Sequence, residues 1–335
     1  MSKRLTEWIR SREGNEAQPS RPKISFVVIV YDMPRQAENT LLSLCSGYQY
    51  GANVSDYEVI VVENESPRTL SPELVDSLPE NYFYYLRANA ETSPVFAINF
   101  GAERARGDHI CVMIDGARMV TPGVIRNLLL GHQLFERAVV AVPGYHLGRE
   151  LQQEAVDGGY SVDQELEMLA ASRWPVDGYA LFDIACFSGS CAPGFFLPNS
   201  ESNCLSIPRT LWRELGGCDE RFDMRGGGLV NLDLYKRACE YPDVRHVIIP
   251  GEGTFHQFHG GVTTGGEARE IREAYIEDSK AQYRSLRGVE YESPNTVPVY
   301  LGEMPPEAQK FVHYSARRVL NHRQEEPLPS PWFDA

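Results

Sequence analysis

Three acidic residues, Asp32, Glu63 and Asp115, each follow a predicted strand in the first 120 residues. In an open parallel sheet, loops and helix N-termini converge beyond the carboxyl ends of the strands, and ligands bind there. A single acid in such a place is commonly a helix cap or a turn former. Three acids at one edge of a sheet instead predict a binding site.

The loops around these acids favour a nucleotide-diphosphate site without a glycine-rich phosphate loop. The segment "YDMPRQ" after the first strand holds no glycine, and no Walker-type loop with its lysine occurs. A nicotinamide-dependent or P-loop enzyme is therefore disfavoured. An acid on the second strand can bond a base or ribose, and an acid on a later strand can hold a ribose hydroxyl or a cation that neutralises a diphosphate.

Apolar strands alternate with helices along most of the chain. The predicted strands cover 24–30, 57–62, 82–86, 109–114, 138–142, 203–207 and 244–249. The predicted helices cover 35–46, 93–107, 121–137, 161–172, 208–215, 229–240, 267–287 and 305–322. This order predicts an α/β fold whose mostly parallel sheet carries helices on both faces. Residues 144–200 break the order, and we expect them to shape a pocket or a partner surface.

Composition narrows the class of protein further. The chain has 32 Lys and Arg residues and 46 Asp and Glu residues. The resulting net charge of −14 disfavours nucleic acid and anionic membranes as main partners. The seven cysteines are scattered along the chain, and their spacing does not suggest a disulfide framework. This indicates a reducing, cytoplasmic location. No apolar run approaches the roughly 20 residues of a membrane span, and no signal peptide is evident.

Several stretches resemble family-2 glycosyltransferases with the GT-A fold, in order and in rough spacing, over about residues 24–261. They are "ISFVVIVYDMPRQAENTLLSL", "YEVIVVENES", "INFGAERARGDHICVMIDGARMVTPGVI", "CLSIPRTLWRELGGCDERF" and "LVNLDLYKR". The resemblance implies a Rossmann-like mixed sheet in a domain at 23–262, after an N-terminal arm (1–22) and before a C-terminal helical extension (263–335). It also implies transfer of a sugar from a nucleotide-diphosphate sugar, UDP-sugar favoured, to a glycan or other hydroxyl acceptor in polysaccharide or glycoconjugate synthesis.

The same resemblance assigns positions in the donor site. These are Val30, Tyr31 and Asp32 in the base pocket, Glu63 against the base or ribose, Asp115 as the first acid of the Asp-x-Asp motif, and Asn99 and Arg104 supporting its loop.

The residues after Asp115 are unusual for this motif. Gly116 and Ala117 are small, so we expect a diphosphate to lie close against the backbone there. Ala117, however, replaces the acid that usually binds metal, and a methyl group cannot coordinate Mn²⁺ or Mg²⁺. Either Asp115 binds the cation with another ligand, or cationic and amide groups such as Arg118 stabilise the diphosphate. Arg118 could equally be a solvated surface charge.

A second departure lies in "RGGGLVNLDLYKRA". Inverting relatives place a catalytic carboxylate where this chain has Asn231, which cannot act as a base. Asp233 either takes that role or supports the site. The alternatives are that Asn231 caps the helix and that Asp233 is a first-turn acid favoured by the helix dipole. Inversion and retention of configuration both stay open.

Two histidines in "FHQFHGGVTT" supply a further candidate site. His256 and His259 follow the last predicted strand, and neutral imidazole is both a Mn²⁺ ligand and a base near neutral pH. We therefore expect Asp115, His256 and His259 to hold a cation, with His259 an alternative catalytic base.

Two other classes of function compete with an active transferase. Ala117 and Asn231 are also what a weakened GT-A domain would retain if it served as a nucleotide-sugar-binding, glycan-binding or scaffold module. A nucleotidyltransferase shares the sheet but usually has a glycine-rich basic loop after the first strand, which "YDMPRQ" lacks. The sequence leaves a homo-oligomer open.

Overall fold

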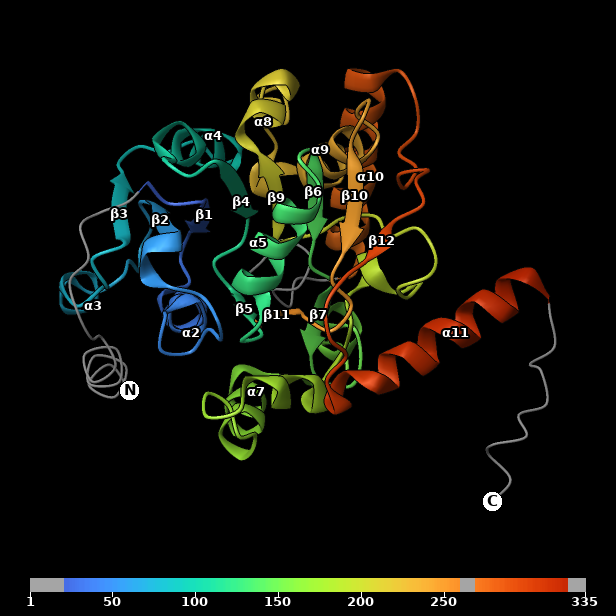
Figure 1. Ribbon diagram of the computed structural model, residues 1–335, viewed down its shortest axis with the longest axis horizontal. Coiled ribbons are helices and arrows are strands. Elements are labelled where there is room, and N and C mark those ends of the chain that lie inside the picture. Colours follow the sequence, from blue (N-terminus) through green and yellow to red (C-terminus); the bar gives the residue numbers. More distant parts are fainter. Residues whose placement is uncertain (1–20, 260–268, 325–335) are drawn as a thin grey trace.

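A computed structural model describes residues 21–259 and 269–324 of the chain. Its main sheet has eight strands in the order β12-β10-β6-β9-β4-β1-β2-β3 (Figure 1). Neighbouring strands run parallel except at β9, which is antiparallel to both β4 and β6. The strands are β1 (Ile24–Val30), β2 (Tyr57–Asn64), β3 (Tyr82–Arg87), β4 (His109–Met113), β6 (Ala138–Ala141), β9 (Leu205–Pro208), β10 (Arg245–Ile248) and β12 (Val299–Tyr300).

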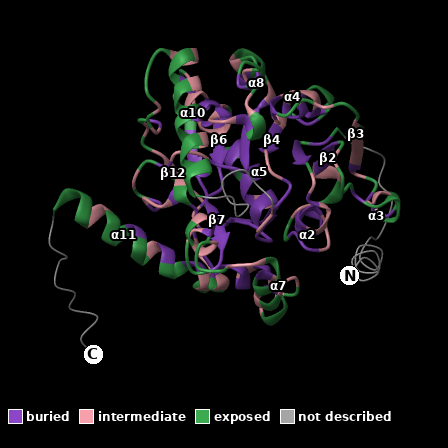
Figure 2. Cartoon of the chain, turned by 180° about the vertical axis from the view of Figure 1, so that it is seen from behind, coloured by how far each residue is buried: buried purple, intermediate pink, exposed green. Residues whose placement is uncertain are grey.

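Helices cover both faces of this sheet, which is why its central strands are buried along their whole length (Figure 2). One face packs against α2 (Pro34–Leu44), α3 (Pro72–Asp76) and α5 (Val124–Leu134). The other packs against α4 (Val95–Arg104), α8 (Arg209–Leu215), α9 (Val230–Cys239) and α10 (Arg269–Arg287). Proline at the first turn starts α2 and α3, and Gly216 in the left-handed conformation ends α8.

A second, four-stranded sheet adjoins the main one. It has the order β5-β11-β7-β8, formed by β5 (Arg118–Val120), β11 (Thr254–His256), β7 (Gly144–Leu147) and β8 (Ala185–Phe187). Residues that pair across strands share a face, so the register sorts the side chains into two rows. Met119, Phe255, Tyr145 and Phe187 form an apolar row. Arg118, His256, His146 and Cys186 form the polar row on the opposite face.

The apolar row fixes the small sheet in place. Tyr145 stacks on Phe255 and on Phe187, with ring centroids 5.2 and 5.1 Å apart. Phe311 of α11 (Gln309–Arg323) closes this cluster, at 4.8 Å from the ring of Phe187. Burial of these aromatic side chains leaves the polar row facing the end of the main sheet, where the candidate site lies.

The structure confirms the expected α/β class, with a mostly parallel sheet between helices. The four strands of the small sheet were not predicted, because runs of three or four residues carry too little periodicity to identify. The region 144–200 is also more regular than expected, since besides α7 (Val162–Ala171), which matches the predicted helix at 161–172, it supplies β7, β8 and α6 (Gln152–Ala155).

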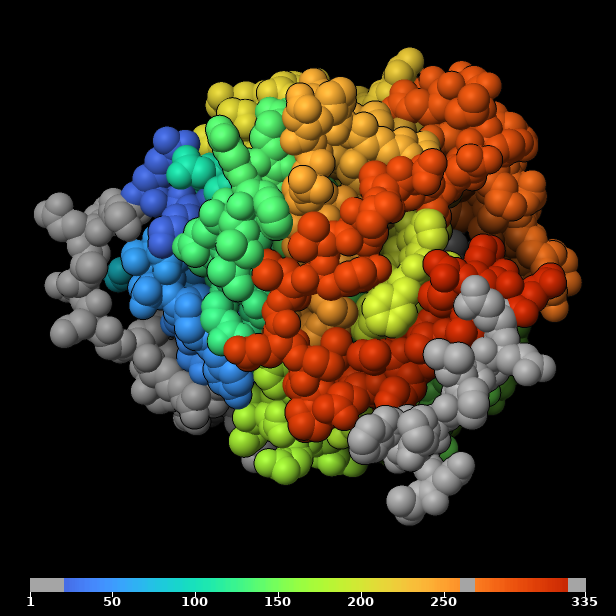
Figure 3. Space-filling view, turned by 45° about the vertical axis from the view of Figure 1, so that its right-hand side comes forward, coloured from blue at the N-terminus to red at the C-terminus, as the bar shows by residue number. Residues whose placement is uncertain are grey.

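The C-terminal extension is integrated into the domain. Besides its two helices it supplies β12, the edge strand of the main sheet, and Tyr300 donates to the carbonyl of Phe195 at 2.8 Å. Figure 3 shows this segment in red and orange lying over the yellow-green residues near 195. Residues 1–20 of the predicted arm (1–22), the glycines and threonines at 260–264 and the Pro-rich end lie outside the described residues. Within the described residues, no helix combines the length and apolarity needed to cross a membrane.

Candidate active site

One carboxylate and two imidazoles converge beyond the ends of β4 and β11. His256 Nε2 lies 3.0 Å and His259 Nε2 lies 3.5 Å from Asp115 Oδ2. The two Nε2 atoms are 3.1 Å apart, and the three donor atoms lie within 4.8 Å of one another. Three electron-pair donors at these distances repel one another unless a proton or a cation lies among them. Carboxylate oxygen and imidazole nitrogen together form a donor set that fits a divalent cation.

The ends of the three neighbouring strands lie at one edge, as predicted. Strand β1 runs between β2 and β4, with Val30 paired to Glu63 and Val28 paired to Met113. The parallel register therefore places Val30 level with Glu63 on one side and with Asp115 on the other.

Gly116 follows Asp115 because this turn packs directly on β1. Its N–H donates to the carbonyl of Ile29 at 2.7 Å, and its carbonyl accepts from Thr40 Oγ1 at 2.6 Å. A Cβ at this position would lie 2.8 Å from the Ile29 oxygen and 3.0 Å from Val30 Cγ2. Contacts with β1 alone, without any ligand, therefore explain why position 116 is glycine.

Ala117 belongs to the apolar core and not to the cluster of Asp115 and the two histidines. Its side chain is fully buried in the apolar core between the sheet and α2, while its N–H donates to Asp115 Oδ1 at 2.9 Å. Its carbonyl accepts from the Gln257 N–H at 2.8 Å, which ties the turn to the histidine segment. An acid at position 117 would enter apolar core, so the methyl group leaves no gap beside Asp115.

Arg118 is a buried cation beside Asp115, and the alternative of a solvated surface charge is wrong. Only 8% of Arg118 is exposed, and it pairs across strands with His256. Its Nε lies 3.8 Å from Asp115 Oδ2, beyond hydrogen-bond distance. Both Nε and Nη1 are buried without a hydrogen-bond partner among the described residues. Unsatisfied, buried guanidinium N–H groups are costly and indicate a place for an anionic ligand.

Burial and neighbouring charges shift the pKa values of Asp115 and His256. Burial by itself would raise the pKa of Asp115, but its neighbours, above all His259, hold it well below its usual range, so the carboxylate is ionised. Burial, with the nearby Arg118 charge, lowers the pKa of His256 to about 4, so this imidazole is neutral at pH 7. A neutral imidazole and an ionised carboxylate are the forms that bind metal.

Hydrogen bonds of Gln257 and Phe258 hold the segment 256–259 against α2 and α7. Gln257 donates to the Gln36 carbonyl at 2.9 Å and accepts from Asn39 Nδ2 at 2.7 Å. The Phe258 N–H donates to the buried carboxylate of Glu165. These bonds hold in place the segment that connects His256 to His259.

The base-pocket positions differ in exposure. Val30 is buried, whereas Tyr31 is 53% exposed at the same edge. Asp32 has a positive φ of 52° and is held by Arg68, whose Nε and Nη2 contact its carboxylate at 2.9 and 3.2 Å. This hydrogen bond from Arg68 lowers the pKa of Asp32.

Glu63 is fully buried and bonded within the protein. Its carboxylate accepts from the Leu70 N–H at 3.0 Å and from Tyr84 OH at 2.6 Å. It thereby anchors the loop that carries Arg68. Direct contact of Glu63 with a base or ribose stays a prediction.

Asn99 and Arg104 contact other parts of the protein than the loop of Asp115. Asn99 Nδ2 donates to the Cys218 carbonyl at 2.9 Å, and Asn99 Oδ1 accepts from the Cys218 N–H at 3.0 Å. The guanidinium of Arg104 lies over the ring of Phe100, 3.3 Å from its centroid. These contacts correct the expectation that both residues support that loop.

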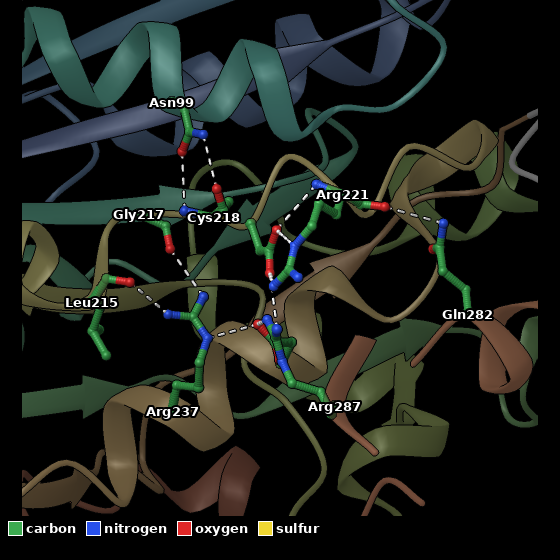
Figure 4. Close-up of polar contacts among 10 residues, drawn as sticks. Asn99, Leu215, Gly217, Cys218, Arg221, Arg237, Gln282 and Arg287 are labelled. Atoms are coloured by element: carbon green, nitrogen blue, oxygen red, sulfur yellow. Dashed lines mark hydrogen bonds and ion pairs between the residues drawn. The ribbon is translucent and has the colours of Figure 1, made fainter. Parts of the chain in front are cut away.

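Asp233 forms ion pairs with two arginines and is not a free carboxylate. It is 1% exposed and accepts from Arg237 Nε at 2.7 Å and from Arg287 Nε and Nη2 at 2.6 and 2.8 Å. Arg237 also donates to the carbonyls of Leu215 and Gly217 (Figure 4). Both carboxylate oxygens of Asp233 therefore already accept hydrogen bonds from guanidinium groups, and these ion pairs connect α10 to α9.

Asn231 lies nearer the candidate site. It is the second residue of α9, so it is not the helix cap, and its Nδ2 donates to Asn203 Oδ1 at 2.7 Å. Asn203 lies two residues before Leu205, which pairs with Val112 of β4. Asn231 is therefore connected to the edge of the sheet at which Asp115 lies.

A family model described as "Glycosyltransferase like family 2" matches residues 26–249. The chain belongs to this family. It is a glycosyltransferase, and the mixed sheet with its antiparallel β9 is its GT-A fold. No curated protein sequence gives a significant match.

Solved structures give distant likenesses. S. aureus TarS 1–349 has 11% identity and a TM-score of 0.48, with 89% of this chain and 72% of that chain covered. Its complex with UDP-GlcNAc has 11% identity, a TM-score of 0.49 and coverages of 89% and 73%. The mannosyltransferase PcManGT from Pyrobaculum calidifontis, in complex with GDP-Man and Mn²⁺, has 14% identity, a TM-score of 0.45 and coverages of 98% and 83%.

Two contributors to this glycosyltransferase site escaped sequence analysis. Arg68 anchors Asp32, and Gln152 of α6 contacts His256 from a segment whose sequence indicated only a variable region. Neither lies in a recognisable motif, because each acts through a contact between segments far apart in the chain.

Replacing Asp233 by Asn should destabilise the protein without impairing the cation site. Loss of the buried charge leaves the two partly buried guanidinium groups of Arg237 and Arg287 under-compensated, at a cost of about 3 kcal/mol. Urea unfolding measures the cost, and Mn²⁺ titration measures the site. The exposed Asp278 of α10, replaced by Asn, is the control. Native stability combined with lost sugar transfer would instead identify Asp233 as a base.

Restoring the second acid of the motif by Ala117→Asp should not create a better cation site. The new carboxylate enters apolar core, so we expect a loss of roughly 3 kcal/mol or more in the free energy of unfolding and no gain in Mn²⁺ affinity. Thermal unfolding with and without MnCl₂ measures both, and Ala316→Asp on the exposed side of α11 serves as the control. A stable variant with tighter Mn²⁺ binding would contradict the orientation of residue 117.

Proposed function

We propose that this glycosyltransferase takes its sugar from a nucleotide-diphosphate donor, UDP-sugar first among the candidates. The acceptor is a hydroxyl of a glycan or another glycoconjugate precursor. The observation that carries the proposal is the convergence of Asp115, His256 and His259 beside the unsatisfied guanidinium of Arg118. Together they offer a cation site and an anion-binding group at the end of β4, as a leaving diphosphate requires.

The cation in this proposal is Mn²⁺ in preference to Mg²⁺. Mg²⁺ favours oxygen ligands and keeps its waters, whereas a mixed set of one carboxylate and two imidazoles suits a softer ion. When bound by these residues, such a cation would neutralise negative charge that develops on the departing diphosphate. The two histidines thus replace the second acid of the Asp-x-Asp motif, which supports an active enzyme over a decayed binding module.

Arg118 would bind the diphosphate directly. Its Nε and Nη1 have no hydrogen-bond partner among the described residues, and the polar row of the small sheet brings it beside His256. A charge-assisted hydrogen bond from a buried guanidinium to phosphate contributes about 2 kcal/mol.

The nucleoside would lie at the neighbouring strand ends. Tyr31 is exposed there and can stack on a base, while the Asp32–Arg68 pair fixes the loop beside it. Glu63 would act by anchoring the Arg68 loop.

The proton of the acceptor hydroxyl has no assigned base in this proposal. His259 is a third cation ligand if it binds through Nε2, and in that state the same nitrogen cannot accept a proton. Asn231 would donate a hydrogen bond rather than accept a proton. The cytoplasmic location stays a prediction, and the stereochemical outcome and the assembly state stay open.

A thermal-shift panel of UDP-, GDP-, CMP- and dTDP-sugars with and without Mn²⁺ tests the proposal. We expect one nucleotide, UDP first, to raise the melting temperature, with a larger shift in Mn²⁺. Asp115→Asn should weaken Mn²⁺ binding by at least about 100-fold, more than loss of an outer-shell partner usually does. Arg118→Met should weaken nucleotide-diphosphate binding by roughly 30-fold.

Arg126→Met, at a partly exposed ion pair with Glu303, is the matched control for Arg118. Donor hydrolysis then separates an enzyme from a binding module. Tight nucleotide binding without turnover of any donor would favour the module, and unchanged donor binding in Arg118→Met would contradict the diphosphate site.

A further inference from the structure

Gln152 lies between two histidines of the polar row and bonds both of them. It is the first residue of α6 and is fully buried. Its side-chain Nε2 donates to the backbone carbonyl of His256 at 2.9 Å, and its Oε1 lies 2.5 Å from His256 Nδ1. Its backbone N–H donates to His146 Nδ1 at 3.0 Å.

These contacts determine where each imidazole carries its proton. The carbonyl of His256 can only accept, so the amide group that faces it must be the Nε2 of Gln152. Oε1 then faces His256 Nδ1, and because Oε1 can only accept, that ring nitrogen must carry the proton. When the ring is neutral, its Nε2 is therefore left with a free electron pair, directed toward Asp115 and His259.

His146 receives the opposite assignment. Its Nδ1 accepts the backbone N–H of Gln152, so the proton of the neutral ring lies on Nε2. His146 and His256 are paired residues of neighbouring strands, with ring centroids 5.5 Å apart. One glutamine thus makes one histidine an electron-pair donor at Nε2 and its neighbour an N–H donor at Nε2.

We propose that Gln152 is a positioning residue that sets the tautomer of His256 and so prepares its Nε2 as a ligand for a divalent cation. The proposal deepens the function proposed above and rests on it for the cation. Outer-shell groups of this kind orient a metal-binding imidazole and raise its basicity. Here the outer-shell group is a neutral amide that also holds the backbone of the histidine it orients.

Metal-free protein labelled with ¹⁵N-histidine provides the decisive test. Long-range ¹H–¹⁵N correlation spectra distinguish protonated from unprotonated ring nitrogens, and His256→Ala and His146→Ala assign the signals. We expect His256 to carry its proton on Nδ1 and His146 to carry its proton on Nε2. His256 protonated on Nε2 would overturn the inference even if Mn²⁺ binds.

Two variants of Gln152 separate a tautomer role from a purely structural one. Gln152→Leu removes the acceptor, so His256 should become a tautomer mixture and Mn²⁺ affinity should fall by about 10- to 100-fold. His146 should keep its tautomer, because its partner is a backbone N–H. Gln152→Glu keeps the acceptor and loses the donor to the His256 carbonyl, and it should retain the Nδ1–H tautomer and most of the affinity.

The exposed Gln164→Leu of α7 is the control for the hydrophobic replacement. Equal loss of affinity in the Leu and Glu variants would show that Gln152 acts only by holding the backbone. If the protein shows the expected tautomers but binds no Mn²⁺, the role of Gln152 in setting the tautomers holds. The proposed cation is then wrong.

Discussion

The site depends on the two-residue alternation of side chains along the four short strands of the small sheet. One row, Met119, Phe255, Tyr145 and Phe187, is buried in an aromatic cluster, and this burial fixes the register. The other row must then face the end of the main sheet. A slip of one residue in β11 would bury His256 among the aromatic rings and remove it from Asp115. The polar chemistry is therefore positioned by apolar packing on the opposite face.

Much of the main sheet follows from the sequence. Long apolar runs such as 24–30 and 57–62 predict buried parallel strands, and the order of strands and helices indicates helices on both faces. The same runs place Val30, Glu63 and Asp115 at one edge, as the register shows. The small sheet could not be predicted in this way, because "TFH" or "ACF" has no local pattern that distinguishes a strand from a loop.

The site residues were predicted best where their place in the sequence, just after a strand, is enough to bring them into the site. Asp115, His256 and His259 were expected to form one cluster, and they do. Residue orientation was harder to predict. Ala117 suggests a missing metal ligand, yet its side chain lies in the core, and Asp233 suggests a base, yet it is engaged by two arginines. Gln152 gave no sequence signal, since its role depends on contacts with two strands distant in the chain.

The central claim is that two histidines replace an acid in holding the cation of this glycosyltransferase. Anomalous diffraction at the manganese absorption edge, from crystals grown with Mn²⁺ and the preferred nucleotide-sugar, tests it most directly. We predict one peak about 2.0–2.3 Å from Asp115 Oδ2 and from the Nε2 atoms of His256 and His259, with the diphosphate in contact with the ion and with Arg118. A bound nucleotide-sugar whose manganese peak lies away from these three residues would contradict the account.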